Sequence, residues 1–293
     1  MIRCNAKASA FSETHVPPKK SFSDKFKPLQ AFLFSEEYAI IVTGVFIMLK
    51  GNKALVTGAS RGIGFAIAKA LADAGCSVVI TGRNAQTLQA AAEQIGGNTT
   101  AMVWDAAEIE LAESKLKEAA ALLGGLDIVV NNAGIFARRS EWNKNSLLQT
   151  TVDEWESVMK TNTSAVFFTM QAAVKYMLEN GVRGNILNVT SVAGNEPVYG
   201  AYGASKIAAT GLTRGWGRMF ASDGITINGI APGPVATEMN NWHEGDPMEH
   251  KRIPFGRFAT IDEIAKLAMY LLSEEAQMIC GETVVFDGGY AIR

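Results

Sequence analysis

The chain has 293 residues, of which 48% are hydrophobic and 19% charged, with a formal net charge of −2. A charge this close to zero gives no support for nucleic-acid binding, which shows as clustered lysine and arginine. The three cysteines and three histidines lie far apart, which argues against a disulfide framework and against a metal site. We therefore expect a reducing, cytoplasmic setting.

The first 47 residues differ in pattern from the rest. They carry six Lys/Arg against four Asp/Glu, a net +2 that leaves −4 for residues 48–293. The apolar run from Ala39 to Leu49 has 11 residues, too short to cross a bilayer, and no cleavage site of a secretory signal follows it. We expect residues 1–47 to be a poorly ordered extension upstream of a functional start at Met48, and residues 48–293 to be one catalytic domain.

From Lys53 onward, short β-branched runs alternate with longer helical patterns. Seven runs are predicted to be strands: 54–57, 77–81, 101–104, 126–131, 185–189, 226–230 and 283–286. They are apolar on both faces, which is typical of buried parallel strands. Helices are predicted to begin after the caps Asn84, Thr151 and Thr260, the last two with capping-box spacing. This alternation predicts an α/β fold, a single domain with a doubly wound, seven-stranded parallel sheet flanked by helices.

The segment ALVTGASRGIG follows the first predicted strand. Its glycines Gly58, Gly62 and Gly64 open a helix, as needed where a backbone turns sharply and approaches a pyrophosphate. Tight turns also use glycine, but the strand-to-helix context favours nucleotide binding.

The end of the second predicted strand bears on the choice of nicotinamide cofactor. An NAD site usually has an acid here to bond the ribose hydroxyls, whereas this strand ends in Ile80-Thr81-Gly82-Arg83. Arg61 in the glycine loop could reach the same region, and two guanidinium groups suit a 2′-phosphate. The alternative is that both arginines are solvated surface residues. The sequence favours NADP(H) over NAD(H).

Polar residues also follow the third and fourth predicted strands. Asp105 could accept a hydrogen bond from an adenine amino group. The turn NNAG at 131–134 could stabilise the sheet or form a wall beside the adenine ribose. Asn131 and Asn132 fit the structural and the binding role equally well.

A tyrosine and a lysine lie four residues apart near the middle of the chain. On a helix, Tyr202 and Lys206 therefore share one face. A free phenol titrates near pKa 10, and bringing it to about 7 takes about 4 kcal/mol, which a lysine cation and a nicotinamide positive charge could supply. Tyr199 is expected in the loop before the helix, as part of a substrate wall.

The segments TGASRGIG, NNAG, Ser191, Tyr202-x-x-x-Lys206 and Pro232-Gly233 occur in the order typical of the short-chain dehydrogenase/reductase family. The chain resembles this family from Met48 to Arg293, and in particular its 3-oxoacyl-[acyl-carrier-protein] reductase branch. The resemblance implies a Rossmann-like domain, an NAD(P)(H) cofactor and carbonyl/alcohol redox chemistry. It implies these cofactor contacts: Gly58, Ser60, Arg61, Gly62, Ile63, Gly64, Arg83, Asp105, Asn132, Ala133, Gly134, Tyr202, Lys206, Pro232, Gly233, Val235 and Thr237.

The resemblance also implies catalytic roles. Tyr202 would protonate the carbonyl oxygen, Lys206 would lower the pKa of that tyrosine and bond the nicotinamide ribose, and Ser191 would orient the substrate. Asn162 would support a proton relay through water, its alternative being a polar residue that bonds helix backbone. Thr237 would contact the nicotinamide carboxamide. Ser191 and Tyr202 are 11 residues apart, fewer than is common in the family, so the substrate class is not inherited with the motifs.

The remaining predictions concern substrate and assembly. Segment 240–252 is either a lid or a polar surface loop, with His243 on the surface. The resemblance also implies docking of an acidic acyl carrier protein on basic residues, because Arg218 falls at one matching position and Arg183 lies close to the other. A stripe of small residues, Ala204, Ala208, Gly211 and Gly215, predicts close helix packing. The resemblance implies that this helix forms a subunit interface of a homotetramer, and packing within one subunit is the alternative.

Three functions stay open at this point. The first is an NADPH-dependent reductase of ketones or 3-oxoacyl carbonyls. The second is a polyol, sugar-acid or hydroxysteroid dehydrogenase, and the third is a non-enzymatic NADP(H)-binding protein. The intact Ser191, Tyr202 and Lys206 argue against the third.

Overall fold

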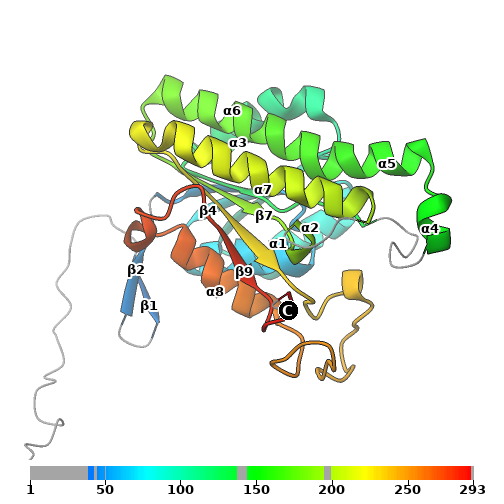
Figure 1. Ribbon diagram of the computed structural model, residues 1–293. Helices are drawn as coiled ribbons and strands as arrows, with labels where there is room; N and C mark the ends of the chain where they lie inside the picture. The colour runs from blue at the N-terminus through cyan, green and yellow to red at the C-terminus, as the bar shows by residue number, and fades with distance from the viewer. Residues whose placement is uncertain (1–38, 43–44, 50, 137–143, 195–198, 292–293) are drawn as a thin grey trace, which may run out of the picture. The chain divides into compact units, whose positions relative to one another are not determined.

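The computed structural model describes residues 39–42, 45–49, 51–136, 144–194 and 199–291. Its central feature is a seven-stranded sheet with the order β5-β4-β3-β6-β7-β8-β9 (Figure 1). All neighbouring strands of this sheet are parallel. The strands are β3 Lys53–Val56, β4 Ser77–Gly82, β5 Asn98–Val103, β6 Ile128–Asn131, β7 Asn185–Val189, β8 Thr226–Pro232 and β9 Thr283–Phe286. The predicted fold class and all seven predicted strands are confirmed.

Helices cover both faces of the sheet (Figure 1). One face carries α1 Gly62–Asp73, α2 Ala85–Ile95 and α8 Ile261–Leu271. The other carries α3 Ala112–Leu123, α6 Ala165–Asn180 and α7 Ala201–Phe220. Two short helices, α4 Lys144–Leu148 and α5 Val152–Met159, lead through a π-helical turn at Lys160–Ser164 into α6. Short 3₁₀ turns lie at Ile109–Leu111, Val192–Gly194, Ala221–Asp223, Glu238–Asn240 and Glu274–Ala276.

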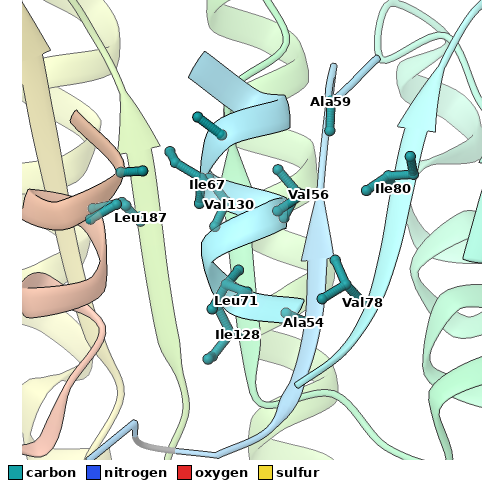
Figure 2. Close-up of a cluster of buried hydrophobic side chains, with 14 of the residues drawn as sticks. Ala54, Val56, Ala59, Ile67, Leu71, Val78, Ile80, Ile128, Val130 and Leu187 are labelled. Carbon is teal, nitrogen blue, oxygen red and sulfur yellow. The ribbon is translucent and has the colours of Figure 1, made fainter. Parts of the chain in front are cut away.

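The core forms because successive strand residues face opposite sides of the sheet. Figure 2 shows Ile67 and Leu71 of α1 among side chains of the central strands, including Val56 of β3 and Val130 of β6. Residues of the opposite parity, such as Leu55, pack against α3 and α6. A fully buried side chain of this size contributes about 1.5–3 kcal/mol. These clusters hold α1 and α7 against the strands whose ends carry the site.

The two end strands depart from the expected burial on both faces. Val103 of β5 is 48% exposed and Val285 of β9 is 43% exposed. An end strand has a neighbouring strand on one side alone, so fewer side chains surround it.

The predicted helix caps are confirmed. Asn84 Oδ1 accepts a hydrogen bond from Thr87 N at 2.9 Å, and Thr151 Oγ1 accepts one from Glu154 N at 3.2 Å. At Thr260 both halves of the capping box form, because Glu263 Oε2 also accepts from Thr260 N at 2.9 Å. These bonds fix the starts of α2, α5 and α8.

The N-terminal extension is partly folded. Ala39–Val42 (β1) and Val45–Met48 (β2) pair as an antiparallel hairpin, and Met48 N donates to Glu275 Oε1 at 3.3 Å. This differs from the expectation of little structure before Met48, because two short apolar runs can satisfy each other's backbone groups. Residues 1–38 lie outside the described residues, so the boundary at residue 48 stays a prediction. Within the described residues, no helix combines the length and apolarity that crossing a membrane requires.

Candidate active site

The predicted site residues gather at the carboxyl ends of the strands, where the strand order reverses between β3 and β6. Ligands bind at such switch points in doubly wound sheets. A cavity of about 250 Å³ lies here, and ten of the predicted residues line it: Ile63, Asn132, Gly134, Ser191, Tyr202, Lys206, Pro232, Gly233, Val235 and Thr237. Gly58, Ser60, Arg61, Gly62, Gly64, Arg83, Asp105, Ala133 and Asn162 are not among its lining residues.

The glycine loop has the geometry that its sequence predicts. Gly58 and Gly62 have φ values of +65° and +62°, in the left-handed region that favours glycine. A Cβ at Gly58 would lie 2.7 Å from the Cα of Ala133, and one at Gly64 would collide with the side-chain amide of Asn132. Glycine is therefore required for the loop to lie directly against the NNAG turn.

The start of α1 can hold an anion. Its N-cap residue Arg61 is extended and makes no side-chain capping bond, and the first turn contains no acidic residue. Among the described residues of this helix end, no carboxylate caps the free N–H groups and so competes with a bound anion. These N–H groups also lie at the positive end of the helix dipole. This arrangement fits a pyrophosphate.

The NNAG turn is tied to the glycine loop by hydrogen bonds. Thr57 Oγ1 accepts from Asn132 N and from Ala133 N, both at 3.1 Å. Asn132 Nδ2 donates to Gly58 O at 2.9 Å, and Asn132 also lines the cavity. Asn131 is buried and donates to Asn188 Oδ1 at 2.9 Å. Asn131 thus has a structural contact inside the sheet, whereas Asn132 occupies a position that suits both predicted roles.

Arg61 has a specific partner in the segment after β8. Its Nη1 lies 2.7 Å from Glu238 Oε2, although both side chains are largely exposed. Arg83 is exposed directly after β4, and a Cβ at its neighbour Gly82 would lie 3.8 Å from Ser60 Cβ. The end of β4 therefore abuts the glycine loop, while Arg61 is ion-paired to a carboxylate.

Asp105 closes a local turn after β5. Its Oδ1 accepts a hydrogen bond from Ala107 N at 3.0 Å. The carboxylate is half-buried and retains acceptor capacity for a second donor.

Helix α7 brings Tyr202 and Lys206 to one side of the cavity. The helix begins at Ala201, so Tyr199 precedes it, as predicted. Lys206 Nζ lies 5.7 Å from the centre of the Tyr202 ring and donates to Val189 O at 3.1 Å. Burial lowers the pKa of Lys206 to about 8, because charge is costly away from water. The ammonium form therefore predominates at neutral pH.

Ser191 and two aromatic side chains complete this side. Ser191 lies just after β7 and lines the cavity, and its Oγ accepts from Ala193 N at 3.2 Å. The rings of Phe136 and Tyr202 are 4.7 Å apart. Tyr199 lines the cavity and is 54% exposed. Residues 195–198, which precede it, lie outside the described residues.

Asn162 lies in the π-helical turn between α5 and α6, a feature frequent at functional sites. Its Nδ2 donates to Ile135 O at 2.9 Å and to Ser205 Oγ at 3.1 Å, and its Oδ1 accepts from Ile135 N at 2.8 Å. A Cβ at Gly134 would lie 3.3 Å from Asn162 Oδ1 and 3.6 Å from Lys206 Nζ. Asn162 thus bonds the loop after β6 rather than helix backbone, and it borders the lysine.

The segment after β8 forms the far wall. Asn240 Nδ2 donates to Val235 O at 2.8 Å, and Thr237 lies beside Gly62, whose Cβ would be 3.9 Å from Thr237 Cγ2. Of the predicted lid or loop 240–252, Asn240 lines the cavity. His243 is exposed, with Nδ1 3.6 Å from Asp246 Oδ2, which fits the predicted surface position. The described residues contain no group of three or more His, Cys, Asp or Glu able to hold a metal ion.

Among the lining residues that the sequence did not predict, the three with the largest side chains are Phe136, Met239 and Tyr290. Tyr290 follows β9, and Phe136 directly follows the NNAG turn and Ile135. The rule that ligands bind beyond the strand ends, applied to the last strand as it was to the first four, would have found Tyr290.

The fold and the site define a nucleotide-binding oxidoreductase of the Rossmann type. A family model described as enoyl-(acyl carrier protein) reductase matches residues 58–291. The chain belongs to the short-chain dehydrogenase/reductase family, whose members bind a nicotinamide cofactor.

The relatives of the chain span several substrates. Gluconate 5-dehydrogenase of Gluconobacter oxydans is 36% identical over 83% of this chain and 96% of its own length. The 3-oxoacyl-[acyl-carrier-protein] reductase of Vibrio cholerae is 37% identical over 82% of this chain and 98% of its own length. A solved structure of a variant actinorhodin polyketide ketoreductase with NADPH has a TM-score of 0.75 at 27% identity, and covers 83% of this chain and 98% of that one.

Proposed function

We propose that the protein is an NADP(H)-dependent reductase that converts a ketone or 3-oxoacyl carbonyl to a secondary alcohol. The observation that carries the proposal is the buried Lys206 ammonium, 5.7 Å from the ring of Tyr202, in the cavity that Ser191 also lines. The relative named 3-oxoacyl-[acyl-carrier-protein] reductase supports a carbonyl substrate.

The glycine loop and the uncapped start of α1 fit the pyrophosphate of the cofactor, which would be held by Gly58, Ser60, Gly62, Ile63 and Gly64, with Thr237 and Val235 at the nicotinamide end. When bound, NADPH supplies the hydride. Ser191 Oγ donates a hydrogen bond to the carbonyl oxygen and orients it. Tyr202 transfers its phenolic proton to that oxygen, and the Lys206 ammonium stabilises the phenolate that remains. Asn162, beside Lys206, orders the water that returns the proton.

The cofactor preference rests on charge at the end of β4. No acid occupies the residues 80–83 that end this strand, and Arg83 is exposed beside the glycine loop. With Arg61 released from Glu238, two guanidinium groups meet a 2′-phosphate. The solved ketoreductase with NADPH supports this preference.

Two measurements on the purified chain test the proposal. The first is titration with NADPH and NADH; we expect NADPH to bind at least about tenfold more tightly, which corresponds to the charge-assisted bonds of one phosphate. The second is a panel of acetoacetyl thioesters, diketones, keto-sugars and ketosteroids assayed by NADPH absorbance. Tighter binding of NADH would reject the roles of Arg61 and Arg83, and absence of turnover would reject the reductase.

A second candidate function is a dehydrogenase acting on a polyol, sugar acid or hydroxysteroid. The relative named gluconate 5-dehydrogenase, at 36% identity, favours it. Oxidation of an alcohol with a kcat/KM above that of every carbonyl in the panel would select this function. NADP(H) binding with no turnover in either direction would instead select a non-enzymatic binding protein.

The proposed assembly is a cytoplasmic homotetramer that packs through α7. Among the described residues, no atom outside the helix lies within 4 Å of a Cβ built at Gly211 or Gly215. Packing within the subunit therefore does not explain why these two positions are glycine. Close approach of a helix from a second copy explains it. Arg183 and Arg218 are exposed and are proposed to meet the acidic surface of an acyl carrier protein.

A further inference from the structure

The outer part of the cavity is formed by large apolar side chains. Phe136, Tyr199, Met239 and Tyr290 line it, and we refer to these four residues as the aromatic wall. Phe136 packs on Tyr202, with ring centres 4.7 Å apart. Phe136 is 37%, Tyr199 54% and Met239 55% exposed, so they present apolar surface to whatever enters.

The described residues that line the cavity offer almost no charge to a ligand. Among the described lining residues, Lys206 alone carries a formal charge, and its ammonium already donates to Val189 O. Arg61 and Glu238 are not among the lining residues. Among these described residues, a substrate carboxylate would find no cation other than the Lys206 ammonium, which the proposed reaction assigns to Tyr202, so it would lose hydration without a dedicated partner.

Tyr290 is held in position by a built turn. Asp287 is buried, and its Oδ1 accepts from Gly289 N while its Oδ2 accepts from Ala291 N, both at 2.8 Å. Tyr290 N donates to Asp287 O at 3.2 Å. The backbone on each side of Tyr290 is thus fixed by one carboxylate.

A second segment supports the same turn from behind. Phe255 N donates to Gly288 O at 3.0 Å, and a Cβ at Gly288 would lie 2.8 Å from Ile253 Cγ2. The guanidinium carbon of Arg252 lies 5.4 Å from the centre of the Tyr290 ring. Because the ring is supported by these contacts, it needs little ordering when a ligand arrives, which favours affinity.

We infer that the substrate is an uncharged ketone with an aromatic or similarly flat apolar group beside the carbonyl, and that Tyr290 selects for this group. The inference rests on the proposed function. The flat group stacks on the aromatic wall while the carbonyl oxygen meets Ser191 and Tyr202. Sugar acids and other carboxylates are disfavoured.

A pair of substrates that share a phenyl ring tests the charge requirement. Ethyl benzoylformate is uncharged, and benzoylformate carries a carboxylate beside the same ketone. We expect kcat/KM, measured by NADPH absorbance, to be at least about a hundredfold higher for the ester. Equal turnover of benzoylformate, or more efficient oxidation of gluconate with NADP⁺, would overturn the inference. If NADPH binds but no carbonyl is reduced, the proposed function itself fails.

Substitution of the wall tests the role of Tyr290. The readout is the ratio of kcat/KM for ethyl benzoylformate to that for diacetyl, which lacks a ring. We expect Tyr290→Ala to lower this ratio about tenfold, mainly through KM, and Tyr290→Phe to preserve it. An unchanged ratio would show that Tyr290 acts structurally and would overturn its selective role.

A second position guards against misfolding of the Tyr290 variant. Met239 is 55% exposed, so Met239→Ala leaves the fold intact and should lower the same ratio about threefold. Met278, which is 96% exposed and outside the cavity, supplies the matched control Met278→Ala. Equal ratios in the two methionine variants would contradict the aromatic wall.

Discussion

Lys206 is the residue on which the proposed chemistry depends most. It is 6% exposed, and its pKa falls from 10.5 to about 8 through burial. The protein bears the cost of an unneutralised ammonium inside a cavity, which is expected where a charge serves a reaction rather than stability.

The pH dependence of unfolding tests the burial of this charge. Because the folded pKa is lowered, the cost is present in full below pH about 8 and is relieved as pH rises toward 10.5. A difference of about 2.5 pKa units corresponds to about 3 kcal/mol. We expect the free energy of unfolding, relative to Lys206→Met, to rise by about this amount across that window. If urea titrations show the same difference in free energy of unfolding between the two proteins at every pH in this window, Lys206 is not a buried cation.

Removing the phenolic hydroxyl tests the acid. We expect Tyr202→Phe to lower kcat by a factor on the order of 10³, while the Kd for NADPH changes little because the ring remains. Stopped-flow turnover and fluorescence titration measure the two quantities. Tyr270→Phe, at a tyrosine on α8 outside the cavity, is the matched control. Substantial turnover by Tyr202→Phe would remove this residue from the acid role.

The ion pair between Arg61 and Glu238 should compete with the cofactor phosphate. An exposed pair of this kind contributes about 0.2–1 kcal/mol. We expect Glu238→Gln to tighten NADPH binding about two- to fivefold at low salt, and to leave NADH binding nearly unchanged. Isothermal titration calorimetry can compare it with Glu244→Gln, an exposed acid for which we expect no such gain. Weaker NADPH binding would show that Glu238 assists the cofactor.

At the scale of single elements, α8 packs against α1, the helix that follows the glycine loop. Its buried residues Ile264 and Ala268 pack in the same cluster as Ile67 of α1. Its first turn is fixed by the capping box at Thr260 and by Arg257, whose Nη2 lies 2.7 Å from Glu263 Oε1. These contacts hold the pKa of Glu263 at about 2, so the pair persists until strongly acidic pH.

Loss of this cap should destabilise the protein measurably. We expect Thr260→Ala to lower the free energy of unfolding by about 1 kcal/mol, and Thr260→Ser to retain most of it because the hydroxyl remains. Urea denaturation of the three proteins gives the comparison. Equal stabilities of the alanine and serine variants would mean that the box contributes nothing.

Elements with a strong local pattern could be predicted from the sequence. The strands, the caps and the position of Tyr202 one turn before Lys206 follow from periodicity and short-range chemistry. The π-helical turn at Asn162 could not be predicted, because the helical pattern continues through it. Of the aromatic wall, Tyr199 is predicted from the sequence and Tyr290 follows the end of a strand. Phe136 and Met239 could not be predicted, because tertiary packing alone brings their loops to the cavity.

For the whole molecule, the exposed face of α7 is the surface through which we propose that subunits associate. The exposed glycines of α7 border a groove lined by Phe168, Leu212 and Trp216. A helix of a second copy could approach closely over Gly211 and Gly215, and aromatic groups beside it would become buried.

A bulky residue in this groove tests the proposed tetramer. We expect Gly215→Leu to keep the monomer fold, because no described atom obstructs a Cβ there, and to gain up to about 1 kcal/mol of helix propensity. Light scattering should show a smaller assembly, while circular dichroism stays native. An unchanged molar mass would place the subunit contacts elsewhere.

The turn closed by Asp287 positions Tyr290, a side chain to which we assign substrate selection and no part in proton transfer. We assign proton transfer to Asn162, Ser191, Tyr202 and Lys206. We assign selection among ketones to the side chains at positions 136, 199, 239 and 290. New preferences could therefore arise by exchange of Met239 or Tyr290, to which we assign no part in proton transfer. That independence offers a physical reason why one scaffold accommodates relatives named for a sugar acid and for an acyl thioester.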